Sequence, residues 1–260
     1  MHPLQGQSAL VTGGSRGIGA AIALRLARDG ARIAVCYHSN EAAATSVVDH
    51  IVVNGGDALP IRLNIADRQS IELAIGQCVD LFGSCDILVN NAGMAALGTA
   101  LTTSDEQLDA LMKVNLHGPL AAAQLVAPHM IAQRRGRIIN ISSIGSLGTA
   151  INGVAGYAMT KAALNMLTKR LAAELGEFGV TVNAVSPGMI ITDLNDATHA
   201  DPQFRATVDN PAATTLLQRN GQPEDIAGVV SFLAGPDASF ITAQVLTVDG
   251  GRKDFLSRSG

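Results

Sequence analysis

The chain has 260 residues and a formal net charge of −4, and 47% of its residues are hydrophobic although only 3% are aromatic. This composition supplies a core packed mainly with Ala, Val, Ile and Leu, and the length suits one large α/β domain or two small ones. No run of basic residues indicates binding to nucleic acid or to an anionic membrane, and no segment approaches the ~20 apolar residues that span a bilayer.

The cysteine and histidine residues indicate neither a disulfide framework nor a metal site. Cys36, Cys78 and Cys85 are an odd number without CxxC spacing, so we expect reduced, partly buried thiols. No two histidines have the i, i+4 spacing of helical metal ligands. The amino-terminal residues lack a charged segment followed by an apolar one, so we expect no signal peptide and a cytoplasmic protein.

Short apolar segments alternate along the chain with longer, Ala-rich segments of helical character. The predicted strands are at 8–12, 32–37, 58–63, 86–90, 137–141, 180–185 and 244–248. The predicted helices are at 17–29, 41–54, 67–82, 104–133, 156–175 and 223–233. Strands this apolar are typical of a parallel sheet covered by helices on both faces. We therefore expect an α/β fold with one doubly wound, Rossmann-type sheet, and a single domain over residues 1–260.

The alternation is interrupted at about 189–222. This stretch has weak periodicity, two prolines and many small polar residues. A loop of this length in a compact domain is usually functional or mobile. We expect it to be a lid over a substrate site.

A glycine-rich segment with the sequence TGGSRGIG, at 12–19, joins the first predicted strand to the first predicted helix. Its glycines allow a tight turn and a close approach of the backbone to a diphosphate, while the helix N-terminus supplies N–H groups. The GxxxGxG spacing differs from the GxGxxG of the common dinucleotide fingerprint. The alternative is a turn that binds nothing, but the position after the first strand favours a dinucleotide.

The residues at the end of the second predicted strand indicate whether the dinucleotide is NAD(H) or NADP(H). NAD sites usually place an acid there, and this chain has Tyr37, His38 and Ser39 instead. Arg16 lies in the glycine-rich segment, so Arg16, His38 and Ser39 are predicted to surround the 2′-phosphate of NADP(H). The alternative is that Arg16 is a solvated cation and that NAD(H) is used as well.

Tyr157 and Lys161 lie four residues apart, on one face of a predicted helix. A nearby cation lowers the pKa of a phenol, which otherwise titrates near ~10, toward working pH. Such a pair is by itself more often a surface feature. Here it follows a strand that ends at Ser142 and Ser143, and parallel sheets bind ligands at the carboxyl ends of their strands. Ser143 could also be an ordinary turn serine.

These motifs, in this order along nearly the whole chain, resemble the short-chain dehydrogenase/reductase family. The resemblance is carried by Gly13, Gly17, Gly19, Asn90, Asn91, Ala92, Gly93, Asn115, Ser143, Tyr157, Lys161, Pro187, Gly188 and Thr192. It implies an NADP(H)-dependent oxidoreductase that moves a hydride between the nicotinamide and a carbonyl/alcohol pair.

The resemblance also implies a role for each catalytic residue. Tyr157 would give a proton to the carbonyl oxygen, or take it from the alcohol, and Ser143 would hydrogen-bond that oxygen. Lys161 would lower the pKa of Tyr157 and hold the nicotinamide ribose, and Asn115 would anchor a water that links Lys161 to solvent. The implied cofactor-binding residues are Gly13, Ser15, Arg16, Gly17, Ile18, Gly19, His38, Ser39, Asn64, Ile65, Asn91, Ala92, Gly93, Tyr157, Lys161, Pro187, Gly188, Ile190 and Thr192.

Two departures from the family and one proline bear on these roles. Asn64 stands where the family usually has an Asp that reads the adenine. The segment from Ser143 to Tyr157 is one residue longer than in many members, which leaves Ser142 as an alternative, and we prefer Ser143. Pro119 lacks the N–H that the carbonyl of Asn115 would accept in a helix, so this carbonyl could hold the water, unless the proline only kinks two packed helices.

The substrate is the least determined feature. The expected contacts, Met94, Ser146, Leu147, Asn152, Val154 and Met189, are small, mixed and non-aromatic. The resemblance is to 3-oxoacyl-carrier-protein reductases and to broad ketone or sugar reductases. An acidic carrier protein needs a basic surface, for which Arg134 and Arg135 could serve, but Glu177 and Phe178 are acidic and apolar where another base would help. We therefore expect a free small ketone or aldehyde.

Three other functions stay open. The chain could be a 3-oxoacyl-carrier-protein reductase, an NAD-dependent alcohol, polyol or steroid dehydrogenase running oxidatively, or a cofactor-sensing protein without turnover. The last does not need a proton donor, which the chain has. The resemblance further suggests a homotetramer in which the helices at 104–133 and 156–175 pack against their copies, with small residues at 121–123 and 162–163 allowing close approach.

Overall fold

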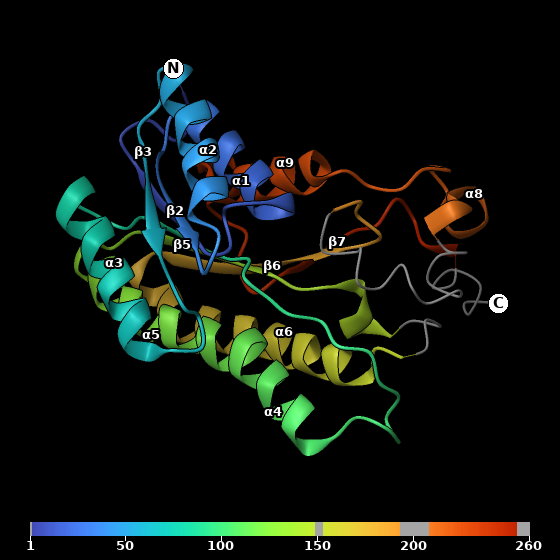
Figure 1. Cartoon of the computed structure of the whole chain (residues 1–260). Coiled ribbons are helices and arrows are strands. Elements are labelled where there is room, and N and C mark those ends of the chain that lie inside the picture. Colours follow the sequence, from blue (N-terminus) through green and yellow to red (C-terminus); the bar gives the residue numbers. More distant parts are fainter. Residues whose placement is uncertain (1, 149–152, 193–207, 254–260) are drawn as a thin grey trace.

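The computed structural model describes residues 2–148, 153–192 and 208–253. At its centre is a parallel sheet with the strand order β3-β2-β1-β4-β5-β6-β7 (Figure 1). The strands are β1 (Ser8–Val11), β2 (Arg32–Tyr37), β3 (Ala58–Arg62), β4 (Ile87–Asn90), β5 (Gly136–Ile141), β6 (Val180–Pro187) and β7 (Val245–Val248). The predicted doubly wound α/β fold is confirmed.

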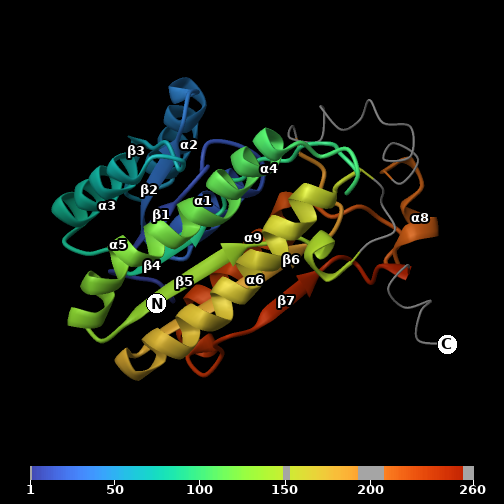
Figure 2. The ribbon, with the colours of Figure 1, turned by 90° about the horizontal axis from the view of Figure 1, so that it is seen from below.

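Helices cover both faces of this sheet. One face carries α1 (Gly17–Arg28), α2 (Glu41–Val53) and α9 (Pro223–Ala234). The other carries α3 (Arg68–Phe82), α4 (Asp105–Met112), α5 (Gly118–Ala132) and α6 (Ala155–Leu175), which Figure 2 shows from below. The short α8 (Pro211–Thr214) lies beyond the carboxyl end of the sheet. In the described part of the chain, no helix is long and apolar enough to cross a membrane.

Alternation of side chains along the strands builds two apolar layers. Val11 packs toward α1 and α9, whereas the preceding Leu10 packs toward α3 and α5. Cys36, Cys78 and Cys85 are free and buried in the second layer, where they act as small apolar residues. Because helices cover both faces of the sheet, the side chains on both faces of each strand are buried, and the strand sequences are apolar throughout.

The helix predicted at 104–133 is divided into three parts. A π-helical turn, Lys113–His117, separates α4 from α5. Pro119 lies in the first turn of α5 and has no N–H for the carbonyl of Asn115, so the regular hydrogen-bond ladder stops there and the turn widens. The helix therefore changes from α to π geometry just before the proline.

The topology creates a crevice at the carboxyl edge of the sheet. The chain leaves β1 toward β2 and β3, then returns to pair β4 with the other side of β1. The connections after β1 and β4 therefore diverge. In open α/β sheets, ligands bind at such a switch point.

Candidate active site

A cavity of about 730 Å³ opens at this carboxyl edge. It is lined by the connections that follow the strands and by the first turns of α6. Every residue that the family resemblance assigns to the cofactor lines it, from Gly13 and Arg16 at one end to Ile190 and Thr192 at the other. The sequence motifs are therefore brought together in one cavity.

The glycine loop has a conformation that only glycines adopt easily. Gly13 and Gly17 have φ of +62° and +51°. A Cβ atom on Gly19 would lie 2.0 Å from the carbonyl oxygen of Gly13. The loop thus leaves room for a diphosphate against the backbone and the N-terminus of α1.

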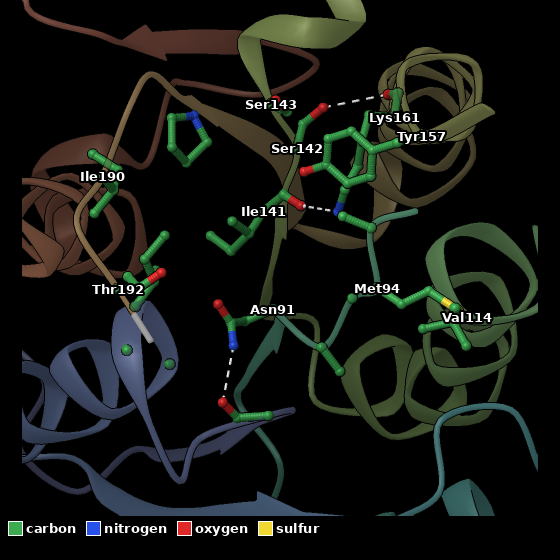
Figure 3. Close-up of a pocket in the computed structure, with 18 of the residues that line it drawn as sticks. Asn91, Met94, Val114, Ile141, Ser142, Ser143, Tyr157, Lys161, Ile190 and Thr192 are labelled. Carbon is green, nitrogen blue, oxygen red and sulfur yellow. Dashed lines mark hydrogen bonds between the residues drawn. The ribbon is translucent and has the colours of Figure 1, made fainter. Parts of the chain in front are cut away.

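Asn91 connects the loop after β4 to the glycine loop. Its amide Nδ2 donates to the carbonyl oxygens of Thr12 and Gly13, both at 3.0 Å, and Figure 3 draws one of these two bonds. The backbone N–H groups of Asn91 and Ala92 donate to Thr12 Oγ1, both at 2.9 Å. These bonds hold the two sides of the crevice at a set separation.

The end of the cavity beside β2 is polar. Arg16, His38, Ser39 and Asn40 line it, and all four are exposed. Asn40 also caps α2 by accepting a hydrogen bond from the backbone N–H of residue 43. Tyr37 does not line the cavity: it is buried, and burial together with a hydrogen bond to Glu41 raises its pKa.

Ser143 and Tyr157 face one another across the cavity wall. Ser143 follows β5, and Tyr157 lies in the first turn of α6. Burial raises the pKa of the Tyr157 phenol, and a hydrogen bond with the side chain of Ser143 acts in the opposite direction. Ser142 instead donates to the backbone carbonyl of Lys161 at 3.3 Å. The geometry therefore favours Ser143 over Ser142 as the partner of Tyr157.

Lys161 is 4% exposed, and its Nζ donates to the carbonyl oxygen of Ile141 at 2.8 Å. Its Nζ lies 5.7 Å from the centroid of the Tyr157 ring. Burial lowers the pKa of Lys161 to about 8. The ammonium is thus directed at the carbonyl of Ile141, and the expected lowering of the Tyr157 pKa by Lys161 stays a prediction.

Asn115 lies in the π-helical turn and does not line the cavity. Its Nδ2 donates to the carbonyl of Met94 at 2.9 Å and to Thr160 Oγ1 at 3.0 Å, and its Oδ1 accepts from the backbone N–H of Met94 at 2.9 Å. The side chain thus braces the loop after β4 against α6. The expected water relay would use its backbone carbonyl.

The expected substrate contacts divide into three groups. Met94, Val154 and Met189 line the cavity. Asn152 lies outside the described residues, as does much of the expected lid. Ser146 and Leu147 are not among the described residues that line the cavity: the hydroxyl of Ser146 donates to the carbonyl of Ser143, and Leu147 is 51% exposed in a 3₁₀ turn, so their contact with substrate stays a prediction.

Several lining residues were not expected from the sequence: Asn40, Leu63, Ala95, Val114, Ile141, Ile144, Gly145 and Arg252. Nearness in sequence to Ser143 could have indicated Ile141 and Ile144. Val114 and Arg252 reach the cavity from distant elements, and no local pattern marks them.

The two arginines expected to offer a basic surface to a carrier protein lie at the other edge of the sheet from the cavity. Arg134 and Arg135 precede β5, so they lie at the amino edge, opposite the cavity. Arg134 donates to the carbonyl of Glu177 at 2.8 Å. Arg135 forms a 3.0 Å ion pair with Asp86, which is 2% exposed.

Comparisons with known proteins agree with the geometry over almost the whole chain. A family model described as enoyl-(acyl carrier protein) reductase matches residues 13–253. The 3-oxoacyl-[acyl-carrier-protein] reductase FabG of Staphylococcus aureus is 42% identical over 94% of this chain and 97% of the relative.

Solved structures match equally widely. A short-chain dehydrogenase/reductase from Serratia marcescens is 40% identical, with a TM-score of 0.88 over 96% of this chain and 99% of that one. A short chain dehydrogenase from Burkholderia cenocepacia, solved in complex with NADP, is 39% identical, with a TM-score of 0.85 over 96% and 98% of the two chains. The chain belongs to the short-chain dehydrogenase/reductase family.

Proposed function

We propose that the chain reduces a free small ketone or aldehyde with NADPH, and that Tyr157 supplies the proton. As a member of its family, the chain is an NAD(P)-dependent oxidoreductase acting on C=O and CH–OH groups. The observation that carries the proposal is the pairing of Tyr157 with Ser143 in the same cavity that the glycine loop borders.

The residues present fit a nicotinamide dinucleotide. The glycine loop approaches so closely that a Cβ on Gly19 would collide with backbone, and no Asp or Glu occurs among the described residues that line the cavity. An acid-free lining suits the phosphates of a dinucleotide. When bound, the nicotinamide supplies or accepts the hydride. Arg16, His38 and Ser39 would hold the 2′-phosphate, which favours NADP(H), the cofactor of the Burkholderia relative's complex.

The chain's own residues would manage the proton. Tyr157 would donate its phenolic proton to the carbonyl oxygen as negative charge develops there, and Ser143 would donate a hydrogen bond to the same oxygen. Lys161, whose pKa is about 8, would carry a positive charge at neutral pH beside the resulting phenolate. A water on the carbonyl of Asn115 would then return a proton from solvent.

A tyrosine pair provides the test. Tyr157→Phe removes only the phenolic hydroxyl and should lower turnover ~10²–10⁴-fold while NADPH still binds, the usual contribution of a positioned acid. The chain has two tyrosines, so Tyr37→Phe is the matched control: Tyr37 is buried outside the cavity, and this variant should keep its turnover. A panel of ketones and aldehydes, followed by nicotinamide absorbance, measures both. Turnover in Tyr157→Phe equal to that of the unmutated protein would refute the mechanism.

A second candidate is reduction of a 3-oxoacyl group on a carrier protein, which the 42% identity to the Staphylococcus aureus reductase favours. Because Arg134 and Arg135 lie opposite the cavity of their own chain, that reaction would require delivery to a neighbouring subunit. A kcat/KM for an acyl-carrier thioester far above that for the matching free ketone would favour this candidate.

We also propose a homotetramer in which α6 packs against a copy of itself. Met159, Ala162 and Met166 are exposed on one face of α6. Ala163 is half-buried, and the small residues at 121–123 are buried within the chain's own core, so the proposed contact is limited to α6.

A further inference from the structure

A chain of hydrogen bonds reaches from the middle of α6 to the backbone of Ser143. Asn165 lies further along α6 than Tyr157 and Lys161 and is 8% exposed, and its Nδ2 donates to Ser146 Oγ at 2.7 Å. The hydroxyl of Ser146 in turn donates to the carbonyl of Ser143. The turn after β5 is therefore tied to the helix that carries Tyr157 and Lys161.

Chemistry fixes the direction of each bond in this chain. A carbonyl oxygen only accepts, so the proton of the Ser146 hydroxyl is committed to Ser143. The group of Asn165 that faces Ser146 Oγ must then be a donor, which is the amide nitrogen. Bonds linked in this way polarise and strengthen one another. The other hydroxyl near Ser146 Oγ, that of Ser142, lies 3.5 Å away, at the limit of a hydrogen bond, and could not replace the amide.

The same turn sets where the hydroxyl of Ser143 points. Ser143 Oγ accepts from the N–H of Gly145 at 3.1 Å. This bond occupies a lone pair and leaves the hydroxyl proton for the cavity, where Ser143 faces Tyr157 (Figure 3). Stabilisation of charge that develops on a substrate oxygen depends on donors held in place before the reaction. A looser turn would therefore weaken the contribution of Ser143.

The steps assigned above to the reaction use neither Asn165 nor Ser146, and neither is among the described residues that line the cavity. We propose that Asn165 is a positioning residue that acts through Ser146 to hold the hydroxyl of Ser143 against Tyr157 and the substrate oxygen. This inference rests on the proposed reduction and adds the residues that prepare its proton-transfer site.

A double-mutant cycle tests the inference by kinetics. Asn165→Ala should lower kcat for a reduced ketone about 3- to 10-fold, the effect of one hydrogen bond, and leave KM for NADPH unchanged. In a Ser143→Ala background the same substitution should change kcat less than about twofold, because no hydroxyl is left to position. Equal losses in the two backgrounds would overturn the inference, since a merely structural role does not depend on the Ser143 hydroxyl.

Ser146 provides a second pair of variants, which leave α6 intact. Ser146→Ala removes the middle of the hydrogen-bond chain and should lower kcat as Asn165→Ala does. Ser146→Thr keeps a hydroxyl and should retain most of the turnover. Ser146→Ala with the kcat of the unmutated protein would overturn the inference.

Thr168→Val is the matched control on the same helix. Thr168 is fully buried, and its hydroxyl bonds with Leu164 and Asn140 instead of the turn after β5. This variant should lower the free energy of unfolding and change kcat less than about twofold. A loss of kcat as large as that of Asn165→Ala would show that any buried polar group of α6 has the same effect, which would overturn the specific role of Asn165.

A spectroscopic measurement separates this inference from the proposed function, because it needs no substrate. In a Tyr37→Phe background, Tyr157 is the one remaining tyrosine, and its ¹³Cζ resonance reports the hydrogen bonding of the phenol. Asn165→Ala should move this resonance toward its position in Ser143→Ala, and should not move it when Ser143→Ala is already present. A resonance that stays in place, or that moves equally in both backgrounds, overturns the inference. Absence of NADPH oxidation with every ketone and aldehyde is instead the failure of the proposed function.

Discussion

At the scale of single residues, the buried charge of Lys161 lowers the free energy of unfolding of the protein. Its ammonium is almost fully buried and is satisfied by one backbone carbonyl, and burial lowers its pKa from an ordinary value near ~10.4 to about 8. Below pH 8 the folded protein therefore carries a buried charge that the unfolded chain would keep in water. A site that needs this charge beside Tyr157 has to tolerate its cost.

This shift predicts a specific pH dependence of stability. Between pH 8 and about 10.4 the unfolded chain binds more protons at Lys161 than the folded protein does, so the free energy of unfolding rises with pH. Relative to Lys161→Met, the unmutated protein should gain up to about 3 kcal/mol across this window. Urea denaturation of both proteins at several pH values from 7 to 10.5 measures the difference. A difference that stays constant with pH would contradict the shift.

Arg16 is the residue on which cofactor choice should depend. It is exposed at the polar end of the cavity, so a charge-assisted hydrogen bond to the 2′-phosphate is partly screened and should contribute near the low end of its range, about 1.5 kcal/mol. Arg16→Ala should weaken NADPH about 10-fold and leave NADH nearly unchanged. Arg28→Ala, an exposed arginine at the other end of α1, is the control. Equal effects on both cofactors in a fluorescence titration would show that Arg16 does not contact the phosphate.

At the scale of elements, the loop between β1 and α1 depends on the absence of one side chain. A Cβ on Gly19 would lie 2.0 Å from the carbonyl oxygen of Gly13 and 2.5 Å from Nδ2 of Asn91, so both sides of the crevice would have to move. Gly76, within α3, has nothing within 4 Å of the same position.

The two glycines therefore predict opposite outcomes. Gly19→Ala should lower the free energy of unfolding by about 1–3 kcal/mol, as overpacking does, and weaken NADPH binding more than 10-fold. Gly76→Ala should raise the free energy of unfolding by up to about 1 kcal/mol, because alanine is the better helix former, and leave NADPH binding unchanged. Denaturant unfolding and NADPH titration measure both. Normal cofactor binding by Gly19→Ala would mean that the loop is less constrained than its geometry indicates.

At the scale of the whole molecule, the exposed methionines of α6 predict how copies associate. Met159 and Met166 are 49% and 58% exposed. A two-fold interface brings the same patch together from both copies, so Met166→Glu would place like charges near one another and should shift the protein toward smaller species. Leu81→Glu, on α3, is the control, since Leu81 is 63% exposed on a different helix. Light scattering at micromolar concentration measures the change. A monomer before mutation would refute the proposed tetramer.

The sequence by itself determined the fold class and the cofactor end of the cavity. The apolar strands specify a parallel sheet that is covered on both faces. The glycine residues of the loop predict backbone conformations and close backbone contacts that other residue types do not allow. Tyr157 and Lys161 are joined by helical spacing, and Ser143 by its position after a strand. These relations depend on residues that are close in the sequence, so the sequence alone predicts them.

Only the tertiary structure decided the remaining features. It left Ser146 and Leu147 out of the cavity lining, gave the side chain of Asn115 a bracing role, and put Arg134 and Arg135 at the opposite edge of the sheet. It also brought Arg252 from beyond the last strand into the cavity wall. The physical reason is that the direction of a side chain, and the groups that surround a charged side chain, depend on packing between elements far apart in the chain. Hydrophobic periodicity and turn chemistry carry no information about such contacts.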